Sequence, residues 1–301
     1  MDLLKRRNMK VLSLFDGISC GRIALERAGI NVSKYYASEI DKHAIKISQK
    51  NWSDIEHVGD IRNLDAERFD GVDLIIGGSP CQSFTRSIST GMEGKSGLIT
   101  EYFRLLKAIK PKWFLLENVV MKKDYERQIS DALGVEPIMI DSSLVSAQKR
   151  QRLYWTNIPV GQPQDREITV RSILTKDNEH RVMNDNPLII SRVGGVIRVK
   201  NGTKLGYLDA YDGDCVNLEY PYSPTRRGRV SRQKTNTLNT ACNYGYNNNG
   251  DLLELNITEY ERLQTLPDGY TEGISLNQRK KVIGNGWTVD VIAHILQGIK
   301  T

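Results

Sequence analysis

The stretch Lys10–Gly21, KVLSLFDGISCG, decides the fold class of this 301-residue chain. Its first part, Lys10 to Phe15, is a short apolar run typical of a buried strand. The turn segment 16–21, DGISCG, follows it directly, and a helical pattern then extends from Arg22 to Ala28. The stretch therefore predicts a strand, a glycine turn and a helix, the unit from which α/β domains are built.

The small residues of this turn favour contact with a ligand. Gly17 and Gly21 let the backbone turn tightly and approach a ligand closely, and Ser19 is a residue type that caps helices. Gly29 closes the helical pattern in the manner of a helix C-terminus. The alternative is a turn of a generic α/β unit.

Two acidic residues follow at the ends of the next strands. Lys34 to Ser38 is predicted as a strand that ends in Glu39, roughly 20 residues after the glycine turn, where Rossmann-like folds place an acid on ribose hydroxyls. A helix is predicted from Asp41 to Asn51, and Asp60 then lies at the end of a further strand, where an adenine amino group could donate to it. An exposed loop position is the alternative for Asp60 taken alone.

A cysteine follows the fourth predicted strand. Val72 to Ile76 is apolar apart from Asp73, which is typical of a strand buried on both faces, and it leads into segment 77–82, GGSPCQ. In open parallel sheets the ligand crevice lies at the carboxyl ends of the strands. We therefore expect Cys81 to face the same cleft as the acids at positions 16, 39 and 60.

Further charged residues are predicted at this edge. A fifth strand, Trp113 to Leu116, ends in Glu117, and Val135 to Ile140 and Leu153 to Ile158 are predicted as later strands. Segment 148–152, QKRQR, lies between these two and brings cations toward the region. The alternatives are a strand-end salt bridge for Glu117 and a solvated basic strand end for the cations.

The composition is that of an ordinary globular protein. The chain is 39% hydrophobic and 26% charged, and no apolar run approaches the length of a membrane-spanning helix. The four cysteines show no CxxC spacing, so we expect neither a metal site nor a disulfide framework, and a reducing cytoplasmic location. The net charge of +6 suits a polyanionic partner, although it also describes many proteins without one.

From about residue 161 to residue 256 the alternation of strands and helices fades. Short segments with Gly and Asn turns replace it, and segment 226–234, RRGRVSRQK, carries five cations without an acid. Such a segment suits contacts with phosphate and guanine, and a solvated basic hairpin is the alternative. After it, Thr258-x-x-Glu261 resembles a capping box, and a closing helix is predicted at about Val289 to Ile299. Tyrosines recur in this region at positions 207, 211, 220, 222, 244 and 246.

Taken in order, these segments resemble the DNA cytosine-5 methyltransferases over nearly the whole sequence. Some details, such as Gly286-Trp287-Thr288-Val289, are similar to the eukaryotic de novo branch. The chain lacks the chromatin-reading modules of that branch, which favours a solitary phage or prokaryotic enzyme. The ordered motifs are Phe15-Asp16-Gly17 to Gly21, Glu39, Gly59-Asp60-Ile61, Pro80-Cys81-Gln82, Glu117-Asn118-Val119, Gln148-x-Arg150-x-Arg152, Glu261-Arg262-Leu263-Gln264, Pro267-Asp268-Gly269-Tyr270 and Ile283-Gly284-Asn285-Gly286.

The resemblance implies methyl transfer from S-adenosylmethionine to carbon 5 of a cytosine in a short context of duplex DNA. Because carbon 5 does not accept a methyl group directly, Cys81 would first add to carbon 6. Glu117 would hydrogen-bond ring nitrogen 3 and the exocyclic amine, and Arg150 and Arg152 would hold the cytosine carbonyl and a nearby phosphate. The base would be rotated out of the stack, beneath a lid formed by residues 83–96.

The implied fold is a Rossmann-like α/β methyltransferase domain, a mostly parallel sheet flanked by helices, with a small, irregular β-rich target-recognition lobe. Residues 1–160 would form the catalytic and cofactor-binding domain, 161–256 the lobe and 257–301 a return to the first domain. The implied cofactor-binding residues are Phe15, Asp16, Gly17, Ile18, Ser19, Cys20, Gly21, Glu39, Ile40, Asp60, Ile61, Pro80, Leu98, Asn285 and Trp287. The implied DNA-binding residues are Gln82, Ser83, Arg86, Arg226, Arg227, Arg229, Arg232, Lys234 and Thr237.

Three other functions stay open at this point. One branch of the same fold methylates tRNA, although the Cys-Phe-Thr element of that branch is absent here. A paralogue that binds DNA without catalysis is a second, and transfer of a larger group from an altered cofactor is a third. The sequence decides neither the target site nor the oligomeric state.

Overall fold

A computed structural model describes residues 8–80, 97–176 and 180–299 of the chain. These residues divide into two compact units. Unit 1 comprises residues 1–140, 151–163 and 289–301, and unit 2 comprises residues 141–150 and 164–288. These bounds differ from the expected division, because residues 141–150 and most of the C-terminal return belong to unit 2.

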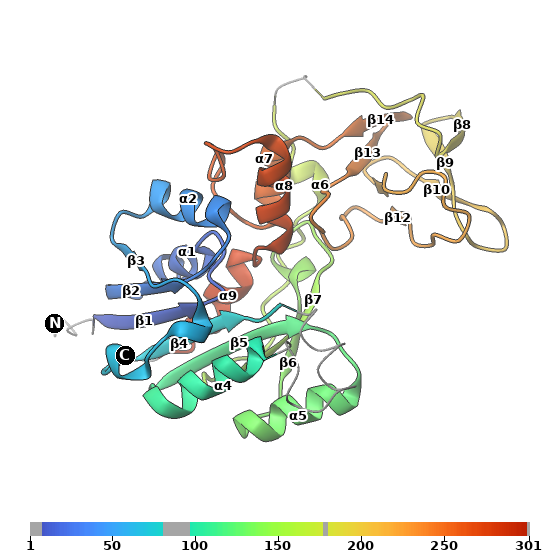
Figure 1. Cartoon of the computed structure of the whole chain (residues 1–301). Helices are drawn as coiled ribbons and strands as arrows, with labels where there is room; N and C mark the ends of the chain where they lie inside the picture. Colours follow the sequence, from blue (N-terminus) through green and yellow to red (C-terminus); the bar gives the residue numbers. More distant parts are fainter. Residues whose placement is uncertain (1–7, 81–96, 177–179, 300–301) are drawn as a thin grey trace, which may run out of the picture. The chain divides into compact units, whose positions relative to one another are not determined.

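The strands of unit 1 form a largely parallel sheet, drawn in Figure 1. Among the described residues it has seven strands in the order β3-β2-β1-β4-β5-β7-β6, and β7 runs antiparallel to β5. Parallel neighbours need crossover connections, which helices supply here. The strands are β1 (Met9–Leu14), β2 (Val32–Ser38), β3 (Ile55–His57), β4 (Leu74–Gly78), β5 (Trp113–Val119), β6 (Ile138–Asp141) and β7 (Gln151–Thr156).

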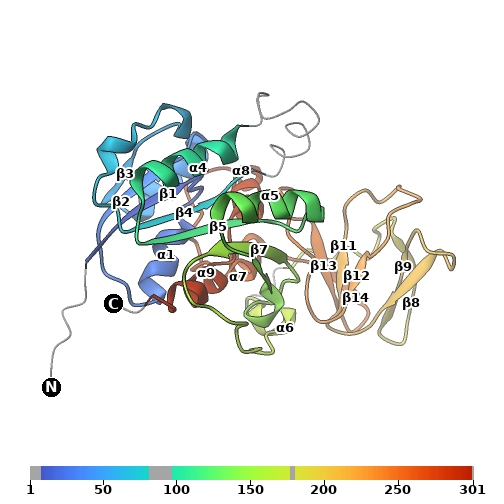
Figure 2. The same ribbon diagram turned by 90° about the horizontal axis from the view of Figure 1, so that it is seen from below.

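Helices cover both faces of this sheet. Figure 2 shows α4 and α5 on one face and α1 and α9 on the other. The first and last described helices pack together, and the ion pair between Arg27 and Asp290 joins them at 2.6 Å. The helical segments of the unit are α1 (Cys20–Arg27), α2 (Lys42–Asn51), η1 (Ile61–Asn63), η2 (Ala66–Phe69), α4 (Leu98–Ile109), α5 (Lys123–Leu133) and α9 (Val289–Leu296).

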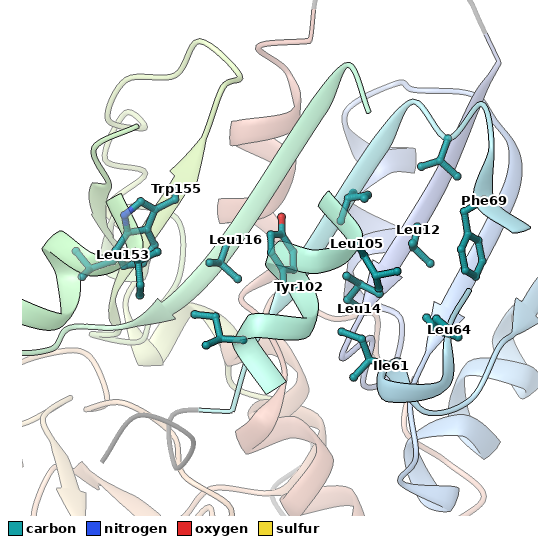
Figure 3. Close-up of a cluster of buried hydrophobic side chains, with 14 residues drawn as sticks. Leu12, Leu14, Ile61, Leu64, Phe69, Tyr102, Leu105, Leu116, Leu153 and Trp155 are labelled. Atoms are coloured by element: carbon teal, nitrogen blue, oxygen red, sulfur yellow. The ribbon is translucent and has the colours of Figure 1, made fainter. Parts of the chain in front are cut away.

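One apolar cluster of unit 1 lies between α4 and the middle of the sheet. In Figure 3, Tyr102 and Leu105 of α4 lie among Leu12 and Leu14 of β1 and Leu116 of β5. All five side chains are fully buried. Burial of a large apolar side chain contributes about 1.5–3 kcal/mol each, so this contact keeps the central strands in place.

The register of the central strands brings distant segments to one edge of the sheet. Leu14 pairs with Ser38 on one side and with Gly77 on the other, and Gly78 pairs with Glu117. The glycine turn after β1, Glu39 after β2 and Ser79 after β4 therefore follow neighbouring strand ends. This edge is where ligands bind in open α/β sheets.

Unit 2 is built from small antiparallel sheets and short helices. Among its described residues, one sheet has the order β10-β9-β8 and another the order β12-β11-β13-β14. The predicted irregular, β-rich lobe is thus confirmed. Its elements are η3 (Ser142–Leu144), α6 (Val170–Ile173), β8 (Ile189–Val193), β9 (Val196–Lys200), β10 (Tyr207–Ala210), β11 (Cys215–Asn217), β12 (Val230–Ser231), β13 (Tyr244–Asn248), β14 (Asp251–Glu254), α7 (Ile257–Leu263) and α8 (Leu276–Asn285).

Two local predictions were wrong at helix ends. The capping box of α7 is formed by Asn256 and Glu259 instead of Thr258 and Glu261, because the helix begins two residues earlier than expected. Ser19 does precede α1, but its backbone is left-handed (φ 61°) and its hydroxyl makes no capping bond to the helix. That hydroxyl bonds Asp16 instead.

Gly284 in α8 is required by close packing. A Cβ at this position would lie 2.1 Å from the carbonyl oxygen of Asn239, a backbone atom that cannot move aside cheaply. We predict that Gly284→Ala lowers the free energy of unfolding by about 2–3 kcal/mol through overpacking. Gly161→Ala is the matched control, because nothing lies within 4 Å of its Cβ position. Urea unfolding of both variants measures this, and equal stability of the two would contradict the close contact.

Candidate active site

The glycine turn after β1 has an unusual backbone. Phe15, Gly17 and Ser19 all have left-handed conformations, with φ of 58°, 61° and 61°. For the two non-glycine residues this costs free energy that other contacts must offset. The Asp16 amide donates to Ser38 at 3.0 Å, and the Gly17 amide donates to Glu39 at 2.8 Å. The end of β2 therefore holds the turn in shape.

The Asp16 carboxyl lies inside this turn and is only 7% exposed. The Tyr35 hydroxyl donates to one of its oxygens at 2.7 Å, and the Ser19 hydroxyl donates to the other at 2.5 Å. Burial raises the pKa of Asp16 to about 6, although the hydrogen bonds from Ser19 and Tyr35 act in the opposite direction. The negative charge of Glu39 raises this pKa further.

Glu39 organises the end of β2. Its carboxylate accepts hydrogen bonds from the backbone amides of Gly17, Ile40 and Asp41, each at 2.8 Å. A carboxylate has about four acceptor positions, so one is left for a further donor such as a ribose hydroxyl. Next to it, the apolar side chain of Ile40 is 69% exposed. An exposed apolar side chain beside a polar turn is a suitable surface for a flat ring.

The loop after β3 differs from the sequence prediction. Asp60 faces its own neighbour, because the amide and the side-chain Nε of Arg62 both donate to it at 3.0 Å, and this contact lowers the pKa of Asp60. The Ile61 side chain is 3% exposed and belongs to the buried cluster of Figure 3, so only its backbone could contact a cofactor. Arg104, which no sequence motif singled out, donates to the carbonyls of Ile61 and Leu64 and anchors this loop.

The other predicted cofactor residues fall into two groups. The side chains of Ile18, Ser19 and Cys20 are buried, so their contribution to a ligand site would come from the backbone. Pro80 is exposed, and Gly21 is buried at the start of α1. Half-buried or exposed positions are found at Phe15, Leu98, Asn285 and Trp287, the last two of which belong to unit 2.

Glu117 and Arg152 form an ion pair at the end of β5. The Arg152 Nε donates to a Glu117 carboxylate oxygen at 2.9 Å, and the two side chains are 14% and 11% exposed. Both residues project from the same face, because Val119 pairs with Arg152 and Glu117 with Tyr154 in the antiparallel ladder. The carboxylate and the guanidinium predicted for catalysis are therefore together.

Asn118 fixes the segment that precedes the predicted nucleophile. Its side-chain amide donates to the Ser79 hydroxyl at 2.9 Å, and both residues are buried. Ser79 ends the described part of this segment together with Pro80. The predicted residues Cys81, Gln82, Ser83 and Arg86, and the lid at 83–96, lie outside the described residues.

Arg150 does not have the surroundings expected of a substrate ligand. It is 5% exposed, and its guanidinium donates to the carbonyls of Leu238 at 3.0 Å and of Gly286 at 3.1 Å. These contacts favour a positioning role, in which Arg150 ties the Thr237-Leu238 segment to the turn after α8. The spacing of the sequence motif does not distinguish a positioning role from a substrate contact, because an arginine at this position could serve either.

A buried amide network in unit 2 was not foreseen. The Gln148 side chain accepts from the Leu238 amide at 2.8 Å and donates to the Gln264 side chain at 3.0 Å. Gln264 in turn accepts from the Thr288 hydroxyl and donates to the Ile283 carbonyl. The regular spacing of QxRxR and ERLQ was the only signal of these residues in the sequence. The network and Arg150 thus hold the same residue, because Gln148 binds the Leu238 amide and Arg150 binds the Leu238 carbonyl.

Two of the five cations of the basic segment 226–234 are paired with acids of unit 2. Arg226 pairs with Glu219 at 2.8 Å, and Arg232 pairs with Asp214. Asp214 precedes β11 and Glu219 follows it. Because β11 pairs antiparallel with β12, the fold brings these acids beside arginines that lie more than six positions later in the sequence. The absence of acids within the segment was therefore a poor guide to its charge.

Two cations of this segment are structural, which corrects their predicted role in DNA binding. Arg229 is 1% exposed and donates to the carbonyls of Glu219 at 2.7 Å and Tyr220 at 2.8 Å. The Lys234 ammonium donates to the carbonyls of Ser143 and Ile168, at 2.6 and 2.8 Å, and burial lowers its pKa. Each cation satisfies carbonyls that irregular backbone leaves unpaired.

Thr237 and Arg227 have more accessible positions. The Thr237 hydroxyl donates to the Lys149 carbonyl at 2.9 Å, and the residue is half-buried. Arg227 is exposed, with one bond to the Gly202 carbonyl at 3.1 Å. Among residues 8–80, 97–176 and 180–299 we find no cluster of metal-ligating side chains, and no helix that has the length and apolar character of a membrane span.

Comparison with known proteins identifies the family. The model of a family described as C-5 cytosine-specific DNA methylase matches residues 9–301. The chain belongs to this family. The predicted family and enzyme class are thereby confirmed, and the alternative of a tRNA-directed enzyme is not favoured.

Two relatives of this DNA methylase chain are a bacterial and a phage enzyme. Type II methyltransferase M1.ScrFI of Lactococcus lactis subsp. cremoris is 26% identical over 97% of this chain and 78% of its own length. Orphan methyltransferase M.SPRI of Bacillus phage SPR is 32% identical, but the match covers 48% of this chain and only 37% of the phage enzyme. These relatives agree with the expected restriction-modification and phage context; the likeness to the de novo branch stays a prediction.

A solved structure confirms the fold of the methylase chain. The Entamoeba histolytica methyltransferase EhMeth superposes with a TM-score of 0.68 at 17% identity, over 97% of this chain and 98% of that one. At this identity the likeness concerns the fold alone. The expected mostly parallel α/β domain with additional antiparallel sheets is therefore correct.

The different surroundings of Arg229 and Arg227 predict different effects on stability. We predict that Arg229→Met lowers the free energy of unfolding by about 2–4 kcal/mol, because buried carbonyls lose their donor. Arg227→Ala, an exposed site, should change it by less than about 0.5 kcal/mol. Urea unfolding curves compare the two variants, and a small effect of Arg229→Met would contradict its structural role.

Proposed function

We propose that this chain transfers a methyl group from S-adenosylmethionine to carbon 5 of cytosine in a short sequence context of duplex DNA. Membership of the C-5 cytosine-specific DNA methylase family supports the reaction type. The observation that carries the assignment to particular residues is the Glu117–Arg152 ion pair, next to the strand that leads into Pro80-Cys81-Gln82. A carboxyl and a cation at that place match the charges that develop when a pyrimidine ring is attacked.

The chemistry assigned to Cys81 is nucleophilic. Its sulfur would add to carbon 6, and the ring electrons displaced by this bond would move toward nitrogen 3 and the carbonyl oxygen. Glu117 would share a proton with nitrogen 3, and Arg152 would hold the Glu117 carboxylate in place and stabilise the carbonyl oxygen. Carbon 5 would then take the methyl group, with S-adenosylhomocysteine as the leaving group. Loss of the carbon 5 proton and release of the cysteine would restore the ring.

The residues of the glycine turn suit S-adenosylmethionine. The cofactor supplies an electrophilic methyl group when it is bound. No atom lies within 4 Å of the position that a Cβ would occupy at Gly17, so there is room for a ligand beside this residue. Glu39 has acceptor capacity for the ribose, and the exposed Ile40 side chain could pack on adenine. We assign Phe15, the backbone of residues 16–21 and Asp60 to the same site.

DNA binding would include extrusion of the target cytosine, which costs a few kcal/mol. Of the predicted DNA-binding residues, Arg227 is the strongest candidate for a phosphate contact. It is exposed, and among the described residues it forms no ion pair. Arg226 and Arg232 would contact phosphate only by sharing or exchanging their carboxylate partners. Gln82, Ser83, Arg86 and Thr237 complete the proposed interface. The relatives support action in the cytoplasm of a bacterial or phage-infected cell.

The proposed reaction is tested on purified enzyme with plasmid DNA and tRNA. Bisulfite sequencing should find modified cytosine in one short context, and labelled methyl groups should enter the DNA but not the tRNA. Cys81→Ala should abolish transfer while DNA binding remains, and Glu117→Gln should lower the rate by about 10²–10⁴-fold. Normal activity of Cys81→Ala would refute the nucleophile, and labelling of tRNA alone would refute the substrate.

The role of Arg227 is tested separately by salt titration. A phosphate contact releases counterions, so Arg227→Ala should weaken duplex binding and reduce the slope of log affinity against log salt by about 1. Lys123→Ala on α5 is the matched control, since it removes one positive charge from a side chain that is 83% exposed. Identical slopes for the two variants would contradict a specific phosphate contact at Arg227.

A further inference from the structure

Asp16 differs from every other buried acid that the structure describes. Six such acids occur among residues 8–80, 97–176 and 180–299, and five of them have a basic partner. Asp16 has no recorded ion pair with lysine, arginine or histidine. The paired acids are Glu117 with Arg152, Asp214 with Arg232, Glu219 with Arg226, Glu259 with His180 and Glu261 with Arg279.

Neutral hydroxyl groups hold the Asp16 carboxyl in place. Tyr35 and Ser19 donate to its two oxygens, and the Ser19 hydroxyl lies 2.6 Å from the Ser48 hydroxyl. Because the Ser19 proton is directed to Asp16, Ser48 donates to Ser19. Ser48 in turn lies 3.2 Å from Nε2 of His57, at the end of β3. These contacts orient the carboxyl without cancelling its charge.

Charged and titratable neighbours do not supply the missing cation. Glu39 accepts a hydrogen bond from the amide of Gly17, the residue next to Asp16, and its negative charge adds to that of Asp16. On α1, Arg22 is directed to Asp54 at 3.3 Å and lies over the Trp52 ring. Burial lowers the pKa of His57, which favours its neutral form at neutral pH. The turn is therefore an anionic site whose ionised form is expensive in the free protein.

Resting on the function proposed above, we infer that Asp16 is the counter-charge for the cationic methyl donor. S-adenosylmethionine carries a sulfonium, whereas the product S-adenosylhomocysteine is a neutral thioether with the same adenosine and amino-acid groups. A buried carboxylate at the turn attracts the first more than the second, since charges interact strongly where water is excluded. Asp16 thus makes the site prefer substrate to product, which helps product leave.

The ionisation of Asp16 sets the pH dependence of this preference. Its pKa of about 6 in the free protein means that the carboxyl is largely protonated at pH 5 and largely ionised at pH 7.5. Binding of a cation favours the ionised form. The affinity for S-adenosylmethionine should therefore rise between pH 5 and pH 7.5, whereas the affinity for S-adenosylhomocysteine should change less.

Calorimetry on the full chain with both ligands, from pH 5 to pH 7.5, tests this inference. Asp16→Asn keeps the size of the side chain and an acceptor oxygen. At pH 7.5 it should weaken binding of S-adenosylmethionine about tenfold, and binding of S-adenosylhomocysteine by less than about threefold. Its substrate preference should no longer depend on pH. Sinefungin, which carries a protonated amine in place of the sulfonium, should follow S-adenosylmethionine.

A second variant separates Asp16 from the other titrating group of the hydrogen-bonded chain. His57→Gln removes that titration but keeps an amide donor for Ser48, and it should retain the pH dependence of the wild type. Loss of the pH dependence in this variant, or equal weakening of both ligands in Asp16→Asn, would overturn the inference. Failure of the wild type to bind either ligand would contradict the proposed function itself.

Discussion

The parallel pairing of β1 with β2 and β4, and of β4 with β5, is the constraint on which the rest of unit 1 depends. Parallel neighbours begin at one edge of the sheet and end at the other, so every segment that follows a strand starts at the same edge. The glycine turn, Glu39, Ser79 and Asn118 are brought together for this reason. Burial of α4 on the central strands keeps that register, because a slip of one residue would turn side chains such as Leu12 and Leu116 away from α4.

Unit 2 differs from unit 1 because much of its backbone is irregular. Its short strands leave many carbonyls without ladder partners, and buried polar side chains satisfy them. Arg229, Lys234 and Arg150 each donate to two or more carbonyls, and Gln148 and Gln264 connect the segments around Leu238. Much of the positive charge of this unit therefore contributes to folding, and a smaller part is available to a polyanion.

The site residues of unit 1 combine well-satisfied and poorly satisfied groups. Glu39 accepts three backbone hydrogen bonds and Glu117 has a guanidinium partner, so the carboxylates of both have donors in the free protein. Asp16 is oriented by neutral donors only, and burial makes its ionised form costly. Such an imbalance is typical of positions that a ligand completes. It places the least compensated charge of the described site on the turn proposed for the methyl donor.

The sequence by itself determined the family, the α/β class and the segments of the site, because strand periodicity, glycine turns and ordered motifs are local properties. It placed Glu117 and Arg152 in one predicted site, and the structure joins them in an ion pair; their catalytic roles stay a prediction. It did not determine that Ile61 is buried, that Arg150, Arg229 and Lys234 bind carbonyls, or that acids beside β11 pair with two cations of segment 226–234. Only the tertiary structure decided these points, because burial and ion pairing depend on groups that are distant in sequence and meet through packing.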